Sequence, residues 1–207
     1  MSKGDSFERD RSRALSLWWS DGERDDLFWR NRTRITSNTP NKERQLGDLT
    51  TVHTDGIPFI ETFNVEFKIG YSKTRKGVRH KVIPWDLLDL IDGKGRVFID
   101  FWDQTTSDAF LSQRIPMLIF KRDHHSPVVA MYAMAVRRLE ELNGRNTKYP
   151  FLTVNIVEHT PIELYGFDEF FRWLRPDVVK LYANILKAPK QSRILRRNTD
   201  ASISGDS

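Results

Sequence analysis

A carboxylate and an amine two residues apart, Glu66 and Lys68, are the side chains in this sequence best placed to do chemistry. Residues 63–69 alternate between apolar and polar types, which predicts a half-buried strand with Asn64, Glu66 and Lys68 on one face. A second carboxylate, Asp48, lies upstream. Two carboxylates and a lysine around a hard cation such as Mg²⁺ suit metal-assisted cleavage of a phosphodiester.

The triplet Glu66-Phe67-Lys68 is a weak signal by itself, because Asp92-Gly93-Lys94 repeats its pattern in a sequence typical of a turn. The triplet is equally compatible with solvated side chains on an exposed sheet face, and Asp48 with an ordinary turn residue after Gly47. Asp55-Gly56 predicts a hairpin between strands at 46–53 and 58–70. That hairpin would bring Asp48 close to the triplet, although the pattern leaves the register open.

The elements that must position these residues predict an α/β fold, with a central mixed β-sheet flanked by helices in a single domain. Residues 1–13 are expected to be disordered, 14–187 to form the domain, and 188–207 to be a basic and then polar flexible tail. Besides the hairpin, the patterns predict helices at 20–31, 84–91, 98–112, 133–142, 169–174 and 177–186, and strands at 116–120, 128–132 and 149–157. The helix at 98–112 is expected to turn Trp102, Ala109 and Phe110 inward.

Composition favours an anionic partner, because 33 Lys and Arg residues outnumber 28 Asp and Glu, for a net charge of +5. Cysteine is absent, which excludes disulfides and Cys-type zinc sites and suits a reducing cytosol. The pair His124-His125 has no matching ligand spacing for a histidine metal site. No apolar run approaches the ~18 residues of a membrane span, and the polar start lacks a signal-peptide core. We therefore expect a soluble cytoplasmic protein with no membrane partner.

Gly47-Asp48, followed eighteen residues later by Glu66-Phe67-Lys68, resembles the motif of the PD-(D/E)XK nuclease superfamily. The flanking segments 22–30, 101–104 and 116–122 resemble a bacteriophage-type, endonuclease-like branch of it, and the resemblance extends over about residues 18–175. The sequence departs from the motif at Gly47, where proline is often found. The resemblance implies a restriction-endonuclease-like core.

The resemblance also implies roles for individual residues. Asp48 and Glu66 would be metal carboxylates, joined by the main-chain carbonyl of Phe67, around Mg²⁺ or Mn²⁺. Lys68 would orient the attacking water or stabilise charge in the transition state. These four residues make up the core of the implied catalytic site.

Two more residues join this implied site from helices. Glu23 matches the position of a further catalytic and metal-binding carboxylate, but Ser20-x-x-Glu23 is also a capping box in which Glu23 would bond only to its own helix start. Gln104 matches a polar residue that faces the active site, but is equally compatible with a solvent-exposed helix position.

Basic residues on both sides of the motif are candidates for contacts with DNA phosphates, although charge runs are also typical of solvated loops. They are Arg30, Arg32, Arg34, Lys73, Arg75, Lys76, Arg79 and Lys81. The expected function is that of a metal-dependent DNA nuclease, phage-encoded, acting in DNA recombination, repair or processing in the host cytoplasm. Cutting both strands would favour a symmetric homodimer. The alternative is a catalytically inactive nuclease-fold protein that binds DNA or assists phage assembly.

Overall fold

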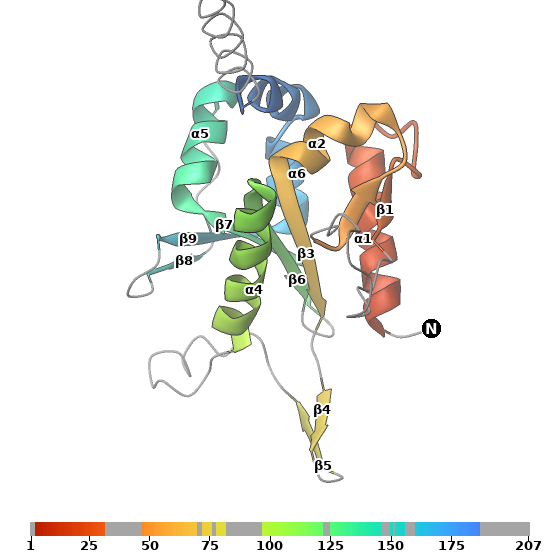
Figure 1. Ribbon diagram of the computed structural model, residues 1–207, viewed down its shortest axis with the longest axis vertical. Helices are drawn as coiled ribbons and strands as arrows, with labels where there is room; N and C mark the ends of the chain where they lie inside the picture. Colours follow the sequence, from red (N-terminus) through yellow and green to blue (C-terminus); the bar gives the residue numbers. More distant parts are fainter. Residues whose placement is uncertain are drawn as a thin grey trace, which may run out of the picture.

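The computed structural model describes residues 3–31, 47–69, 72–75, 78–81, 97–121, 125–145, 150, 152–155 and 160–186 (Figure 1). Along the chain the elements are α1 (Lys3–Trp19), β1 (Phe28–Arg30), β2 (Leu49–Thr51), the 3-10 turn η1 (Thr54–Gly56), α2 (Ile57–Thr62), β3 (Phe63–Ile69), β4 (Ser72–Arg75), β5 (Val78–Lys81), α4 (Val97–Ser112), β6 (Ile115–Lys121), β7 (Val128–Tyr132), α5 (Ala133–Asn143), β8 (Leu152–Val154), β9 (Ile162–Gly166) and α6 (Phe167–Trp173). A further helical segment covers 176–186.

The centre of the fold is a five-stranded mixed sheet in the order β3-β6-β7-β9-β8. β3 and β6 run parallel, and the other neighbouring pairs run antiparallel. Helices lie on both faces of the sheet, with α4 on one face and α1 and α6 on the other (Figure 1). The predicted α/β single-domain fold with a central mixed sheet is therefore confirmed.

The alternation of side chains along β3 decides what each face of the sheet carries. Phe67 points to the α1 face, where its ring meets Phe7 edge-on at 6.1 Å between centroids. Glu66 and Lys68 point to the α4 face, beside the smaller apolar core that Trp102 of α4 helps to form. β3 is an edge strand with β6 on one side, so its other side is open to a partner from outside the sheet.

The predicted pairing of the first two strands is wrong. β2 pairs antiparallel with β1, not with β3, and Asp55-Gly56 belongs to the 3-10 turn that leads into α2. Pro58 lies in the first turn of α2, where its fixed φ and missing N–H are tolerated. A helix therefore replaces the expected first part of the second strand.

The start of the chain also differs from the prediction. Residues 1–13 were expected to be disordered, but α1 begins at Lys3, so this prediction is wrong from that residue onward. Phe7 and Leu15 are buried against the sheet, and tertiary packing of that kind supplies most of the stability of a short helix. The helix expected at 20–31 is replaced by a turn and the strand β1.

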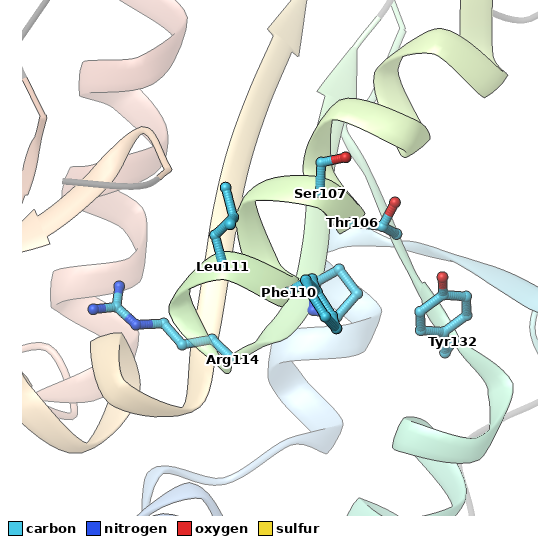
Figure 2. A pocket seen from close by; sticks show the side chains of 7 residues that line it. Thr106, Ser107, Phe110, Leu111, Arg114 and Tyr132 are labelled. Carbon is cyan, nitrogen blue, oxygen red and sulfur yellow. The ribbon is translucent and has the colours of Figure 1, made fainter. Parts of the chain in front are cut away.

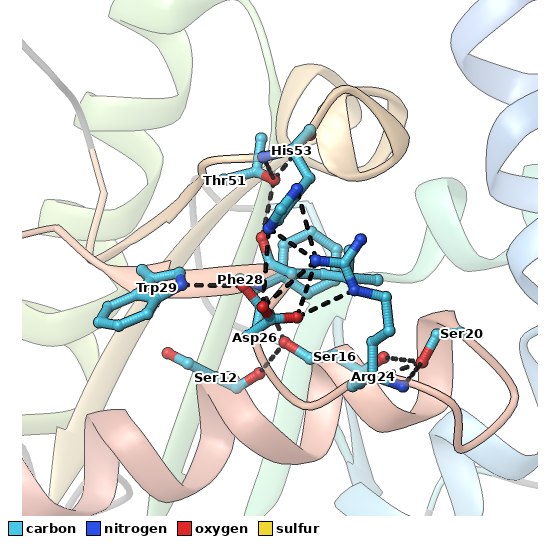
Figure 3. Close-up of polar contacts among 10 residues, drawn as sticks. Ser12, Ser16, Ser20, Arg24, Asp26, Phe28, Trp29, Thr51 and His53 are labelled. Carbon is cyan, nitrogen blue, oxygen red and sulfur yellow. Dashed lines mark hydrogen bonds and ion pairs between the residues drawn. The ribbon is translucent and has the colours of Figure 1, made fainter.

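Side-chain hydrogen bonds hold the β1–β2 hairpin against the end of α1 (Figure 3). The hydroxyl of Ser16 accepts the N–H of Phe28 at 2.8 Å, and the hydroxyl of Thr51 donates to the carbonyl of Leu27 at 2.8 Å. Arg24 donates to the carboxylate of Asp26 at 3.0 and 3.2 Å. These polar contacts fix β1 and β2, and with them Asp48, which directly precedes β2, to the body of the fold.

The later elements agree more closely with the sequence. α4, β6, β7 and α5 lie where the helix and strand patterns placed them, and Gly144 ends α5 in the left-handed conformation at φ +62°. Within the strand expected at 149–157 the structure has the shorter strand β8, and the strand β9 was not predicted. The short helix predicted at 84–91 and the predicted tail at 188–207 lie outside the described residues. Among the described helices, none has the length and apolar content that crossing a membrane requires.

Phe110 corrects the predicted packing of α4, because its side chain is 83% exposed, whereas Phe98 on the same helix is 3% exposed. Phe98→Ala should therefore lower the free energy of unfolding by about 3–5 kcal/mol, and Phe110→Ala should change it by less than about 0.5 kcal/mol. Urea unfolding of the two variants measures the difference. Equal losses in the two variants would contradict this placement of α4.

Candidate active site

Asp48 is docked onto the open side of β3 through both its backbone and its side chain. Its N–H donates to the carbonyl of Val65 at 2.8 Å, and its carboxylate accepts the N–H of Phe67 at 2.8 Å. The N–H and the carbonyl of one residue in a strand point to the same side. The main-chain carbonyl of Phe67 therefore also lies on the side of Asp48, outside the ladder with β6.

Glu66, Lys68 and Gln104 form a closed triangle of hydrogen bonds on the α4 face of β3. The ammonium of Lys68 donates to Glu66 Oε1 at 2.5 Å and to Gln104 Oε1 at 3.1 Å, and Gln104 Nε2 donates to the same Glu66 oxygen at 3.0 Å. The side chains of Glu66 and Lys68 are only 4% and 11% exposed. They are therefore not solvated residues on an open sheet face, and Glu66 Oε1 is held by two hydrogen bonds.

The carboxyl groups of Asp48 and Glu66 come within hydrogen-bonding reach of each other. Burial, followed by the charge of Asp48, raises the pKa of Glu66 to about 7, while the charge and the hydrogen bond of Lys68 act in the opposite direction. Burial also raises the pKa of Asp48, although the N–H of Phe67 and the charge of Lys68 act in the opposite direction. Two buried like charges this close are costly unless a cation joins them, which is why this pair fits a metal site.

Glu8, a carboxylate on α1 that was not among the residues predicted from the sequence, lies near this pair. Burial raises the pKa of Glu8, and the charge of Asp48 raises it further, while the charges of Arg30 and Lys68 lower it. The N-terminal end of α1 lies at the same end of the fold as the C-terminal end of β3 (Figure 1). Phe7, Ala14, Leu15 and Trp18 are spaced as one helical face and would have indicated this helix.

Asp108 is a further acidic residue whose charge acts on this pair. It lies on α4 four residues after Gln104, on the same side of the helix. Its charge raises the pKa of both Asp48 and Glu66. The carboxylates of Asp48, Glu66, Glu8 and Asp108, here called the acidic group, therefore come from α1, β3, α4 and the segment before β2.

Glu23 is not brought to this group. It is exposed in the turn after α1. A helix rises about 1.5 Å per residue, so the end of α1 at Trp19 lies roughly 16 Å along the helix axis from Glu8, and Glu23 lies beyond that end. The capping box proposed for it is absent there too, because Ser20 Oγ accepts the N–H of Arg24 and no helix begins. Glu8, not Glu23, is the carboxylate that the first helix directs at the site.

The predicted phosphate contacts lie in different settings. Arg30 forms ion pairs with Asp5 at 2.7 Å and with Glu8 at 3.5 Å. Its positive charge therefore offsets part of the negative charge of these carboxylates. Residues 72–81, expected as a loop, include the hairpin β4–β5, in which Lys73 stands opposite His80. This hairpin follows β3 and extends away from the body of the fold (Figure 1), with Lys73 and Arg75 on one strand and Arg79 and Lys81 on the other. Arg32, Arg34 and Lys76 lie outside the described residues.

The donor set can be tested against a divalent cation. Within the described residues, no three acidic, histidine or cysteine side chains form a metal cluster. Asp48, Glu66 and the carbonyl of Phe67 nevertheless supply two carboxylates and one neutral oxygen, and Mg²⁺ commonly takes one or two protein carboxylates and keeps several waters. The residues present fit a cation of this kind.

A hollow of about 610 Å³ lies elsewhere, beside the second half of α4 (Figure 2). It is lined by Thr106, Ser107, Phe110, Leu111, Arg114, Pro116 and Tyr132. None of these residues belongs to the acidic group.

A mixed sheet whose edge strand carries a buried glutamate and lysine, with an aspartate docked beside them, defines a nuclease-type core of the PD-(D/E)XK class. A family model described as "phage putative PDDEXK endonuclease" matches residues 1–175, and the chain belongs to that family. The resemblance found in the sequence is therefore confirmed, and the family description supports a nuclease. No curated protein and no solved structure is significantly similar to the chain.

The raised pKa of Glu66 predicts how stability depends on pH when no metal is bound. Between the ordinary value of 4.5 and about 7 the folded chain holds the extra proton, so the free energy of unfolding should fall as pH rises through this window. Glu66→Gln should remove this contribution, on the order of 1–3 kcal/mol. Urea unfolding at pH 5 and pH 8 in EDTA measures it. Glu141→Gln, an exposed control, should keep the slope of the unaltered chain, and an unchanged slope in Glu66→Gln would contradict the prediction.

Proposed function

We propose that the chain is a metal-dependent DNA endonuclease that hydrolyses phosphodiester bonds at the group formed by Asp48, Glu66 and Lys68. The observation that carries the proposal is the convergence of one buried and one partly buried carboxylate whose pKa values are raised, with a lysine hydrogen-bonded to the buried one. PD-(D/E)XK nucleases generally use divalent metals, and the oxygen donors here favour Mg²⁺ or Mn²⁺.

Asp48, Glu66 and the carbonyl of Phe67 would hold the cation. When bound, the cation supplies positive charge and lowers the pKa of a coordinated water. Glu66 is oriented for this by Gln104 and Lys68, which both bind its Oε1. Lys68 also contributes a fixed positive charge to stabilise the negative charge that grows on the phosphate oxygens in the transition state.

DNA would reach the site along the C-terminal end of β3. The basic hairpin β4–β5 continues directly from that strand, and its cationic residues are suited to contact phosphates without reading sequence. Arg32 and Arg34 would add to this charge. Arg30 instead balances Glu8 and Asp5 in the absence of metal.

The family's phage origin supports a role for the enzyme in DNA recombination, repair or processing within the host cytoplasm. A symmetric homodimer would place two such sites on the two strands of a duplex.

Separate substitutions of Asp48 and Lys68 by Ala test the proposed site. Each should lower kcat roughly 100-fold or more on linear, nicked, flapped or four-way DNA with Mg²⁺, because each removes a group that acts in the transition state. The two variants should differ in metal binding. Lys68→Ala should keep a Mn²⁺-dependent rise in melting temperature, and Asp48→Ala should lose it.

Asp100→Ala is the matched control, because Asp100 is an exposed carboxylate on α4 and should leave cleavage unchanged. If the unaltered chain cuts none of these substrates, or if Asp48→Ala cuts as well as it does, the nuclease proposal is wrong. Salt-sensitive DNA binding without any metal effect would instead favour an inactive nuclease-fold protein that only binds DNA.

Glu8 and Glu23 give a paired prediction about the first helix. Glu8→Gln should lower cleavage at limiting Mn²⁺ by roughly 10-fold, because Glu8 adds negative charge near Asp48 and groups that surround a metal site tune its affinity on this scale. Glu23→Gln should leave cleavage unchanged, since Glu23 is exposed beyond the other end of α1. A Mn²⁺ titration of cleavage measures both variants, and the reverse order of effects would contradict the placement of α1.

A further inference from the structure

Gly47, the residue before Asp48, is held in a conformation and a position that exclude a side chain. Its φ is +86°, and a Cβ built on it would lie 2.8 Å from Asn64 Oδ1 and 3.0 Å from the carbonyl oxygen of Val65. Proline, which is often found here in the family's motif, is restricted to φ near −65°. This chain must therefore orient Asp48 by a different backbone route.

The side chain of Asn64 occupies the space that a side chain at Gly47 would need. It is 0% exposed and lies on the same face of β3 as Glu66 and Lys68. Neither its Oδ1 nor its Nδ2 has a hydrogen-bond partner within the described residues. Burying a carboxamide in this way is unfavourable, and an apolar residue at position 64 would avoid that cost. Because this carboxamide makes no hydrogen bond within the described residues, Asn64 can act on Gly47 only through the shape of its side chain.

Within the described residues, Asn31 and backbone groups of β3 hydrogen-bond to the Gly47-Asp48 pair. Asp48 bonds to Val65 and Phe67 on β3, and Asn31 donates its N–H to the carbonyl of Asp48 at 2.7 Å and its side-chain amide to that of Gly47 at 3.2 Å. Asn31 and β3 thus hold the pair from two sides. The Asn64 carboxamide closes a third side, the one toward which a side chain at 47 would point.

We propose that Asn64 is a positioning residue for Asp48, acting through Gly47, so that the Gly47–Asn64 contact sets where the Asp48 carboxylate lies relative to Glu66. The inference rests on the proposed function, because it concerns the cation that this pair would hold. Removing the Asn64 side chain leaves space beside Gly47, and the backbone at Gly47 can then shift toward position 64. A displacement of about 1 Å in such a group can cost roughly 100-fold in rate.

Glycine-to-alanine substitutions test the contact without using activity. Gly22 has nearly the same φ as Gly47, +88°, but a Cβ there would meet nothing within 4 Å. Gly22→Ala therefore reports the strain of positive φ alone. Gly47→Ala should lower the melting temperature by several degrees more than Gly22→Ala does. In an Asn64→Ala background, the loss caused by Gly47→Ala should shrink toward the value for Gly22→Ala.

Mn²⁺ titrations test the positioning role. Asn64→Ala should raise the Mn²⁺ concentration for half-maximal cleavage, and for half of the melting-temperature rise, by roughly 10-fold, as for other groups that support metal ligands. Its affinity for DNA in EDTA should match that of the unaltered chain, which a general loss of structure would not allow. Gly22→Ala should match the unaltered chain in both measurements.

The inference is overturned if Asn64→Ala keeps the Mn²⁺ midpoint of an active unaltered chain, or if the Gly47→Ala loss is the same in both backgrounds. If Asn64→Ala does not fold, Asn64→Leu is measured instead, because leucine is also branched at Cγ and keeps a side chain of similar shape in contact with Gly47. That variant should keep the Mn²⁺ midpoint within about threefold, and a shift of tenfold or more overturns the inference. Failure of the unaltered chain to cut or bind Mn²⁺ identifies failure of the proposed function instead.

Discussion

The docking of Asp48 onto the open side of β3 is the interaction on which the rest of the site depends. An edge strand presents unpaired N–H and carbonyl groups along one side. Here the chain uses that side for Asp48, through the carbonyl of Val65 and the N–H of Phe67. If β2 had paired with β3 in a regular ladder, the carbonyl of Phe67 would have been taken by a hydrogen bond. The edge position of β3 keeps that oxygen available as a proposed metal ligand.

This docking brings together charges that would otherwise repel. The charge of Asp48 raises the pKa of Glu66 and of Glu8, the charge of Asp108 raises the pKa of Asp48 and of Glu66, and burial is the largest cause of all three shifts. Lys68 offsets part of this charge. The fold thus tolerates an unfavourable acidic group at one place, a pattern typical of sites where a cation or substrate supplies the missing charge.

α4 shows how one helix serves both the scaffold and the site. Trp102 is fully buried in the core against β6 and its neighbours, while Gln104, two residues later, faces Glu66 and Lys68. The packing of Trp102 in the apolar core therefore fixes the position of α4 over the sheet and its rotation about its own axis. That rotation directs Gln104 toward Glu66 and Lys68. A polar residue that acts on the site is positioned by apolar contacts several ångströms away.

Local patterns were sufficient where one signal dominated. Alternation identified β3, a continuous apolar run identified β6, and Gly144 marked the end of α5. They failed for the β1–β2 pairing, because it joins segments distant in the sequence, and for the start of α1, where charged residues outnumber the apolar residues that have helical spacing. Phe7 gains its stability from the sheet, and the turn signal Asp55-Gly56 was compatible with either a hairpin or a helix start.

The sequence by itself determined the α/β class, the strand that carries Glu66-Phe67-Lys68 and the family resemblance, because these depend on the order and type of neighbouring residues. Only the tertiary structure decided which residues join that motif. It brought in Glu8 from α1, left Glu23 outside, and seated Gly47 against Asn64. Those choices depend on how helices and loops pack onto the open side of β3, and packing between distant segments leaves no fixed spacing in the sequence.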